Sequence, residues 1–169
     1  LITKAKADGM IALAITDHGN MFGVKEFHNT ARKKGIKPII GCEVYMASRS
    51  RFDKTDKQDA GGRHLILLAK NFTGYHNLVR LVSYGWTEGF YYKPRLDKEL
   101  LAKYCEGLIA SSACLNGVIS SVLRNEGIEE ARKTILEFKS IFNDDFYLEL
   151  QRHRSEDEQI NKEVYNDQV

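Results

Sequence analysis

The feature that most constrains the fold is a stretch at 11–20 whose character changes in its middle. Residues 11–16 are all apolar or β-branched, and the polar sequence Asp-His-Gly-Asn follows them directly. An apolar run without alternation is typical of a strand buried on both faces, as in a parallel sheet covered by helices. Asp17 and His18 then lie at the carboxyl end of that strand, where α/β folds gather ligands and catalytic groups. The alternative is an ordinary turn that caps the following helix.

Apolar runs and helical spacing alternate along the rest of the chain. Further strands are predicted at 36–46, 65–69, 107–110 and 146–150, and helices at 20–35, 74–85 and 128–142. Asp97 begins a further short helix, and the segment 90–95 is expected to be irregular. The polar stretch 47–62 is long enough to be a lid, a binding loop or a disordered segment. Strands separated largely by helices predict a parallel α/β sheet or barrel.

Composition sets looser bounds on the class of protein. With 169 residues, 43% hydrophobic and 28% charged, the chain can bury one core, which predicts a single domain. A formal net charge of +2 does not by itself indicate a nucleic-acid partner. Three cysteines, odd in number and widely spaced, indicate neither a disulfide framework nor a zinc knuckle. No apolar run approaches the roughly 20 residues of a membrane span, so we expect a cytoplasmic protein without a membrane partner.

Side chains that bind metal ions recur at the ends of the predicted strands. They are Asp17, His18, Glu43, His64, Cys114 and His153. Imidazole and carboxylate groups suit zinc, manganese or iron, and two such ions can clamp the attacking and leaving oxygens of a phosphoryl group. Each residue alone also has a structural interpretation, for example Glu43 paired with a lysine or Cys114 in the core. Together they predict a metal site, for which His64 requires the preceding loop or an antiparallel strand to bring it inward.

Five segments carry a resemblance to a known family. They are Thr-Asp-His-Gly-Asn-Met at 16–21, Ile-Ile-Gly-Cys-Glu-Val-Tyr at 39–45, His-Leu-Ile-Leu-Leu-Ala-Lys-Asn at 64–71, Gly-Phe-Tyr-Tyr-Lys-Pro-Arg at 89–95 and Leu-Glu-Leu-Gln-Arg-His at 148–153. These segments resemble the polymerase and histidinol phosphatase (PHP) domain. The last two narrow the resemblance to the PHP domain of the bacterial DNA polymerase III alpha subunit, and the similarity extends over nearly the whole chain.

The resemblance implies a distorted (β/α)7 TIM-like barrel with up to three divalent metal ions at one mouth. Zinc is the expected metal, with manganese or iron as alternatives. The positions that match family ligands are His18, Glu43, His64, Cys114 and, less closely, His153. His18 and Glu43 are the expected catalytic pair. Asp17 is expected to orient its neighbours without touching the metal.

Two family motifs are missing from the sequence. PHP domains of this kind begin with a strand carrying His-x-His-Ser and end with a strand carrying Asp-x-His, and neither occurs here. The resemblance therefore implies that 1–169 is one incomplete PHP domain, a piece of a longer polymerase chain that lacks the first and last barrel strands. Its metal cluster would be incomplete, and its open sheet edges would favour self-association.

Three functions follow from the resemblance for the domain itself. The first is a metal-dependent phosphoesterase of 3′–5′ exonuclease type, favoured because every covered ligand position keeps a ligating residue. The second is a non-catalytic scaffold that docks the proofreading exonuclease. The third, which the polymerase-specific segments disfavour, is a free-standing phosphatase such as histidinol phosphatase. The parent chain is implied to be a DNA-directed DNA polymerase, a nucleotidyltransferase that acts on DNA with other holoenzyme subunits. Its magnesium-dependent palm domain lies outside this sequence.

Overall fold

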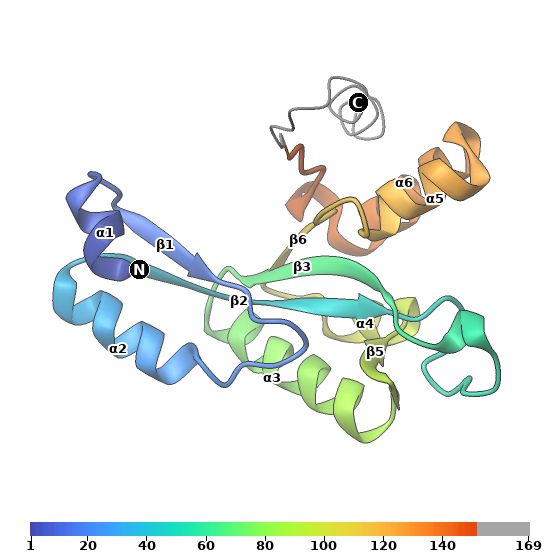
Figure 1. Cartoon of the computed structure of the whole chain (residues 1–169), viewed down its shortest axis with the longest axis horizontal. Helices are drawn as coiled ribbons and strands as arrows, with labels where there is room; N and C mark the ends of the chain where they lie inside the picture. The colour runs from blue at the N-terminus through green and yellow to red at the C-terminus, as the bar shows by residue number, and fades with distance from the viewer. Residues whose placement is uncertain (152–169) are drawn as a thin grey trace.

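The computed structural model describes residues 1–151 as a mixed α/β fold built on one open sheet (Figure 1). Its strands are β1 (Ala12–Ile15), β2 (Lys37–Met46), β3 (Arg63–Ala69), β4 (Phe90–Tyr91), β5 (Lys93–Leu96), β6 (Leu108–Ser111) and β7 (Phe146–Tyr147). Its helices are α1 (Ile2–Ala7), α2 (Val24–Lys34), α3 (Phe72–Thr87), α4 (Lys98–Tyr104), α5 (Val118–Glu126) and α6 (Ile128–Phe142), with short 3-10 turns η1 (Lys57–Asp59) and η2 (Asn143–Asp145).

The ten-residue strand β2 organises the sheet. The strand order is β4-β5-β2-β3-β6-β7, and β1 also pairs with β2. The first half of β2 pairs in parallel with β1, its last two residues pair in parallel with β5, and β3 runs antiparallel along 41–46. The register of β1 continues beyond its end, so that His18 forms a bridge with Glu43 between the β1 and β5 pairings. Glu43 is thereby flanked by the loop after β1 and by β3.

The prediction of a parallel sheet is wrong for β3, which runs antiparallel to both β2 and β6. The reason lies in the connection over 47–62, which contains only the turn η1 and no crossover helix. A parallel pair needs a crossover connection, usually a helix, whereas an antiparallel return does not. The described strands form an open sheet and do not close a barrel.

Two local expectations also need correction. The segment 90–95 is not irregular, because β4 and β5 form a hairpin that turns at Tyr92, whose φ is 60°. The first strand is not buried on both faces, since Ala14 of β1 is exposed and the other three residues of the strand are only partly buried. Helix α5 was not predicted from the sequence. By contrast, the expected helix at 128–142 is confirmed, and Asp97 caps α4 by accepting a hydrogen bond from the Leu100 N–H.

The main core lies between β2, β3 and β6 and the helices α3, α4 and α6. Its members include Val44, Leu65, Leu67, Leu78, Leu81, Leu101, Leu108 and Phe138. A second, smaller cluster joins α2 to α1 and the β1–β2 pair, and comprises Ile2, Phe27, Ala31 and Ile36. In Figure 1, α2 and α3 lie below the sheet, whereas α5 and α6 lie above it. Among residues 1–151, no helix combines the length and apolar character that crossing a bilayer requires.

The segment 47–62 is held down by arginine side chains rather than free to act as an open lid. The guanidinium group of Arg95 is fully buried and donates hydrogen bonds to main-chain carbonyl groups. Its acceptors are Gly89 O at 3.0 Å, Asp59 O at 2.6 Å, Arg51 O at 3.1 Å and Asp53 O at 2.9 Å. Three of these four carbonyls belong to the 47–62 segment, which Arg95 therefore fixes to the β4–β5 hairpin.

Candidate metal centre

The site is built around Glu43, in the middle of β2. The main chain after β1 runs beside it, because the Glu43 N–H donates to Asp17 O at 3.0 Å and the Gly19 N–H donates to Glu43 O at 2.8 Å. These two bonds place His18 opposite Glu43, with Nδ1 of His18 2.6 Å from Oε1 of Glu43. The Glu43 side chain is 11% exposed and that of His18 is 73% exposed. A buried carboxylate thus meets an imidazole that faces solvent.

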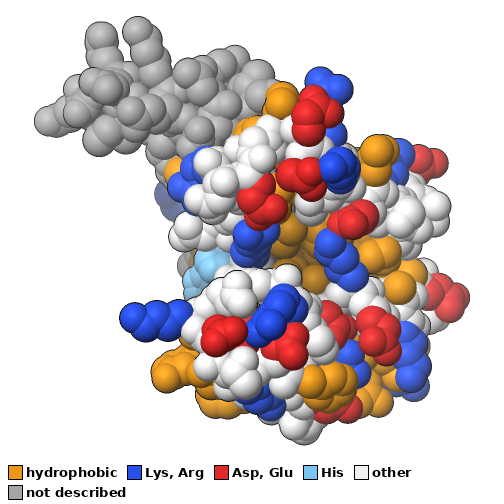
Figure 2. All heavy atoms as spheres, turned by 90° about the vertical axis from the view of Figure 1, so that its right-hand side faces the viewer, with side chains coloured by type: hydrophobic (Ala, Val, Ile, Leu, Met, Phe, Trp, Pro, Cys, Tyr) orange, Lys and Arg blue, Asp and Glu red, His pale blue; other side chains and the backbone are white. Residues whose placement is uncertain are grey.

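His64 approaches the same carboxylate oxygen from β3. Its Nδ1 lies 3.2 Å from Oε1 of Glu43, and the centres of the His18 and His64 rings are 6.5 Å apart. The antiparallel direction of β3 brings His64 inward, which confirms one of the two routes that the sequence required for this residue. Figure 2 shows histidine side chains on the surface at the junction between the upper and lower parts of the molecule.

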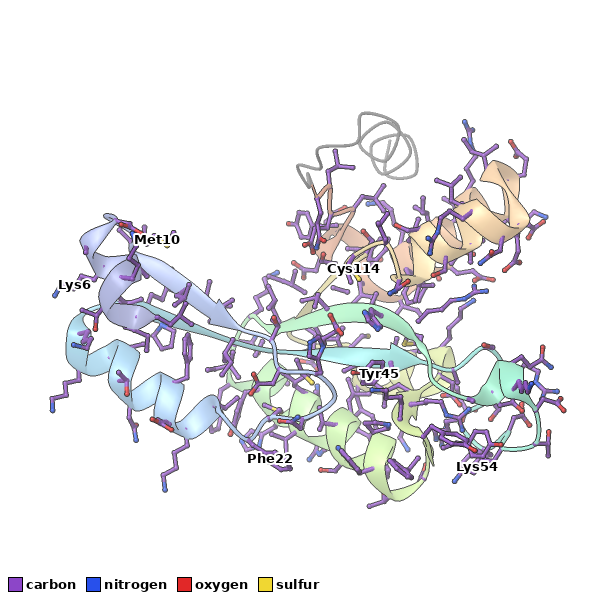
Figure 3. All side chains as sticks on the ribbon, viewed as in Figure 1. Lys6, Met10, Phe22, Tyr45, Lys54 and Cys114 are labelled. Carbon is purple, nitrogen blue, oxygen red and sulfur yellow. The ribbon has the colours of Figure 1, made fainter. Side chains whose placement is uncertain are left out.

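Cys114 completes the group, from the turn after β6. Its Sγ lies 3.4 Å from Nδ1 of His64. The turn is tight, since the Gly117 N–H donates to Cys114 O at 2.8 Å and a Cβ atom at Gly117 would lie only 2.0 Å from Ser112 O. Any side chain at Gly117 would therefore displace the turn that carries Cys114. Figure 3 labels Cys114 above β3 and Tyr45 on β2.

Two aromatic residues that the site analysis of the sequence missed support the histidines. The Tyr45 ring packs edge-on against His64, with ring centres 5.3 Å apart, and Nε1 of Trp86 in α3 donates to Gly19 O at 2.8 Å. Burial, and then the negative charge of Glu43, raise the pKa of Tyr45. Gly19 has a φ of 67°, and a Cβ there would lie 2.9 Å from the Tyr45 ring. Tyr45 lies two residues after Glu43, on the same face of β2, which is the signal that could have identified it.

Cys42, next to Glu43 in the sequence, has a different role from Cys114. Its thiol is buried and donates to Asp17 O and Asn20 O, each at 3.3 Å. Burial raises its pKa to about 12, so the sulfur stays protonated. A protonated thiol is a poor metal ligand, and Cys42 instead ties the loop after β1 to β2.

The remaining predicted residues stand apart from this group. Asp17 contacts Glu43 and Cys42 through its main-chain carbonyl, while its side-chain Oδ2 lies against Gly23, the N-cap of α2. Its expected orienting role remains a prediction. His153 lies outside the described residues.

The donor groups are of the types that bind metal ions, but they are not arranged around a common centre. Two imidazoles, a carboxylate and a thiol form the donor set, and such groups suit zinc, manganese or iron. In the part of the chain that the structure describes, no three His, Cys, Asp or Glu side chains are placed to hold one ion. The donors contact one another instead, since both histidines direct Nδ1 at Oε1 of Glu43.

The comparisons with known proteins show the family to which the chain belongs. The PHP domain model matches residues 1–153, and the chain therefore belongs to the PHP domain family. Within that family, the chain is similar to the PHP domain region of DNA polymerase III alpha subunits.

Three relatives illustrate the match to DNA polymerase III subunit alpha. The protein of Borreliella burgdorferi is 53% identical over 163 residues, or 95% of this chain. That of Thermus aquaticus is 50% identical over 144 residues (84% of this chain), and that of Aquifex aeolicus is 45% identical over 166 residues (95%). The chain spans only 12–14% of the length of these relatives.

A solved structure is also similar in part. A Bifidobacterium adolescentis protein proposed to be a metal-dependent phosphoesterase matches 98% of this chain, and the match covers 75% of that protein. The TM-score is 0.48 at 13% sequence identity, too low to inform the site.

Proposed function

We propose that this chain is the PHP region of a bacterial replicative polymerase and carries the candidate site of a metal-dependent phosphoesterase. The observation that supports the proposal most is the convergence of His18 and His64 on one oxygen of Glu43. These residues come from two strands and a loop that are far apart in sequence. Cys114 adds a fourth donor, a thiol, beside His64.

Each residue has a distinct part in this proposal. His18, Glu43, His64 and Cys114 would hold metal ions, and a bound ion would supply a Lewis acid for a phosphoryl oxygen and an activated water. His18, mostly exposed, stands on the side from which a phosphate ester would arrive. Tyr45 packs against His64 and restricts its orientation.

The proposal also includes the architecture of the complete domain. In the complete domain, further strands would pair with the open edges of the sheet and close a PHP-type (β/α)7 barrel. Among residues 1–151, β1 pairs with β2 alone, and its other edge lies next to the His18 loop, where a neighbouring strand could add ligands. The metal would be zinc, or manganese or iron, with up to three ions.

The parent chain would be a DNA-directed DNA polymerase in chromosome replication. Nucleotide addition would occur at a magnesium site outside this sequence, on DNA and with other subunits of the holoenzyme. The similarity to polymerase III alpha subunits supports this assignment.

The first test is metal content, measured by plasma mass spectrometry on the full-length polymerase chain and on its His18→Ala/Glu43→Ala variant. We expect about two or three equivalents of zinc, manganese or iron in the parent and a loss of most of them in the variant. His76→Ala is the matched control, because His76 lies on α3 and contacts Phe72 instead of the site. Hydrolysis of a primer with a mismatched 3′ end then tests the activity. A folded protein that takes up no added metal would rule out the catalytic proposal.

A second candidate, a non-catalytic scaffold that docks the proofreading exonuclease, is favoured by one observation. The donor groups hydrogen-bond to one another and, within 1–151, do not form a three-ligand cluster. A protein that lacks metal but still binds the exonuclease would support this candidate.

A further inference from the structure

An apolar groove lies between α2 and α3. Both helices cover the same side of the sheet (Figure 1). Its volume is about 1140 Å³. Pro38 and Ile40 of β2 line its floor, and Val79 and Val82 of α3 line one wall. The residues of the candidate metal site, His18, Glu43, His64 and Cys114, do not line it. The groove is therefore a separate feature of the surface.

Large aromatic side chains stand exposed around this groove. Phe22 is 87% exposed, Phe72 is 74% exposed and Trp86 is 46% exposed. Figure 3 labels Phe22 just before α2, where the chain passes close to α3. Burying apolar surface is worth roughly 25 cal/mol per Å², and contiguous exposed apolar patches on soluble proteins commonly mark interaction sites. The groove thus has the apolar surface of an interface.

The charge around the groove has one sign. Lys25, Arg32 and Lys37 line it together with His28, and none of its lining residues is Asp or Glu. None of these three cations pairs with a carboxylate of the described residues. On the face shown in Figure 2, by contrast, acidic and basic side chains alternate.

The cationic residues of α2 form one stripe along the groove. Lys25, His28 and Arg32 lie three and four residues apart, the spacing that places side chains on one face of a helix. Lys25 and Arg32 are separated by seven residues, or about 10.5 Å along the helix axis. Two carboxylates seven residues apart on a second helix would match this distance.

We propose that the groove binds an acidic amphipathic helix of a partner protein. The floor is the face of the sheet and both walls are helices, so an added β-strand, which needs a free sheet edge, does not fit. The partner's apolar side chains would contact Val79, Val82 and the exposed aromatic rings. Its carboxylates would face Lys25 and Arg32. Helix α2 has 11 residues and spans about 16 Å, which sets a bound length of about three turns.

The test uses two fluorescent synthetic peptides with the full-length polymerase chain and measures binding by anisotropy. The first is an acidic helix with Leu at every third or fourth position and Glu seven residues apart on its flank. The second has the same composition in scrambled order. We expect the first peptide to bind more tightly, and the Lys25→Glu/Arg32→Glu variant to weaken its binding about tenfold.

Lys33→Glu/Lys54→Glu is the matched control, because it changes the net charge equally but neither residue lines the groove. It should bind within about twofold of the parent. Val79→Asp should weaken binding without charge reversal on α2, and circular dichroism checks that each variant is folded.

Three results would overturn the proposal. They are equal binding of both peptides, binding that survives Lys25→Glu/Arg32→Glu, and displacement of the acidic peptide by a single-stranded oligo-dT. The last would indicate a nucleic-acid groove, since aromatic and cationic side chains also bind single strands. All of these measurements are made with a chelator present, so they are independent of whether the metal site is active.

Discussion

Nδ1 of His18 lies 2.6 Å from Oε1 of Glu43, although the first side chain is mostly exposed and the second is buried. The pair depends on two main-chain hydrogen bonds between β2 and the loop after β1. Because the carboxylate is rigidly held in the sheet, it fixes an imidazole that would otherwise be free to rotate in solvent. Glu43 is therefore the residue whose change should affect the site most.

Glu43→Gln keeps the shape of the side chain but removes its charge. We expect metal affinity to fall by at least about 10- to 100-fold, as when an orienting or ligating carboxylate is lost. The protein should stay folded, since an amide oxygen can still accept a hydrogen bond from His18 or His64. Isothermal titration with zinc measures the affinity, and thermal unfolding measures the fold. Glu129→Gln, in the first turn of α6, is the control. Unchanged zinc affinity in Glu43→Gln would contradict a role for this residue in metal binding.

Cys42 should react with alkylating reagents far more slowly than the partly exposed Cys105. The pKa of Cys42 is raised to about 12 by burial, so at pH 8 only about one thiol in 10⁴ is ionised. We expect iodoacetamide to leave Cys42 unmodified in the folded protein and to modify it after unfolding in urea. Mass spectrometry of digested samples measures both states, with the partly exposed Cys105 as internal reference. Modification of Cys42 as fast as Cys105 would mean that its thiol is accessible and not held by Asp17 O and Asn20 O.

The sequence predicted the candidate site better than the topology that assembles it. Residues of metal-ligand type can be recognised from the sequence alone. Four of the six that were predicted, His18, Glu43, His64 and Cys114, contact one another in a chain. The direction of β3 cannot be predicted in the same way, because it depends on the structure of the segment that connects β3 to β2. A polar segment of that length can contain either a crossover helix or, as here, a short 3-10 turn.

Long-range packing explains the other differences. Arg95 lies in a segment that looked irregular, and a charged residue in such a segment is normally exposed, so no local pattern indicates a fully buried guanidinium. Trp86 lies one residue beyond the predicted helix at 74–85, and its hydrogen bond to Gly19 spans 67 residues. Helix α5 carries its four apolar residues, Val118, Ile119, Val122 and Leu123, at helical spacing, but it has only nine residues, so the periodic pattern extends over little more than two turns.

Asp59 should make stability depend on pH in the acid range. Its carboxylate accepts hydrogen bonds from the Arg49 guanidinium and from the Thr55 and Asp56 N–H groups, and its pKa is lowered to about 2, chiefly by Arg49. Because the folded-state pKa lies below the unfolded value of about 3.9, the stabilisation is present above pH 4. It is lost as the pH falls from about 4 to about 2.

Asp59→Asn tests this pH dependence. We expect the variant to unfold at lower urea concentration than the parent at pH 7, and the difference to shrink below pH 4. Asp144→Asn is the control, since the Asp144 side chain is fully exposed and does not contact Arg49. A difference between parent and Asp59→Asn that stays constant down to pH 2.5 would show that the carboxylate charge does not contribute.

Arg95 should be the most sensitive position for the segment 47–62. Arg95→Met removes every donor and leaves four buried or half-buried carbonyl groups without this partner, which we expect to cost about 3–5 kcal/mol of unfolding free energy. Arg95→Lys should cost less, because an ammonium group keeps three donors but cannot reach all four acceptors. Urea unfolding measures the loss, and hydrogen exchange locates it: amide protection should fall within 47–62 before it falls in β2. Arg132→Met, on α6, is the control for loss of an arginine. If Arg95→Met retained both the parent stability and the protection of 47–62, the segment would have to be held by its carboxylate–arginine pairs alone.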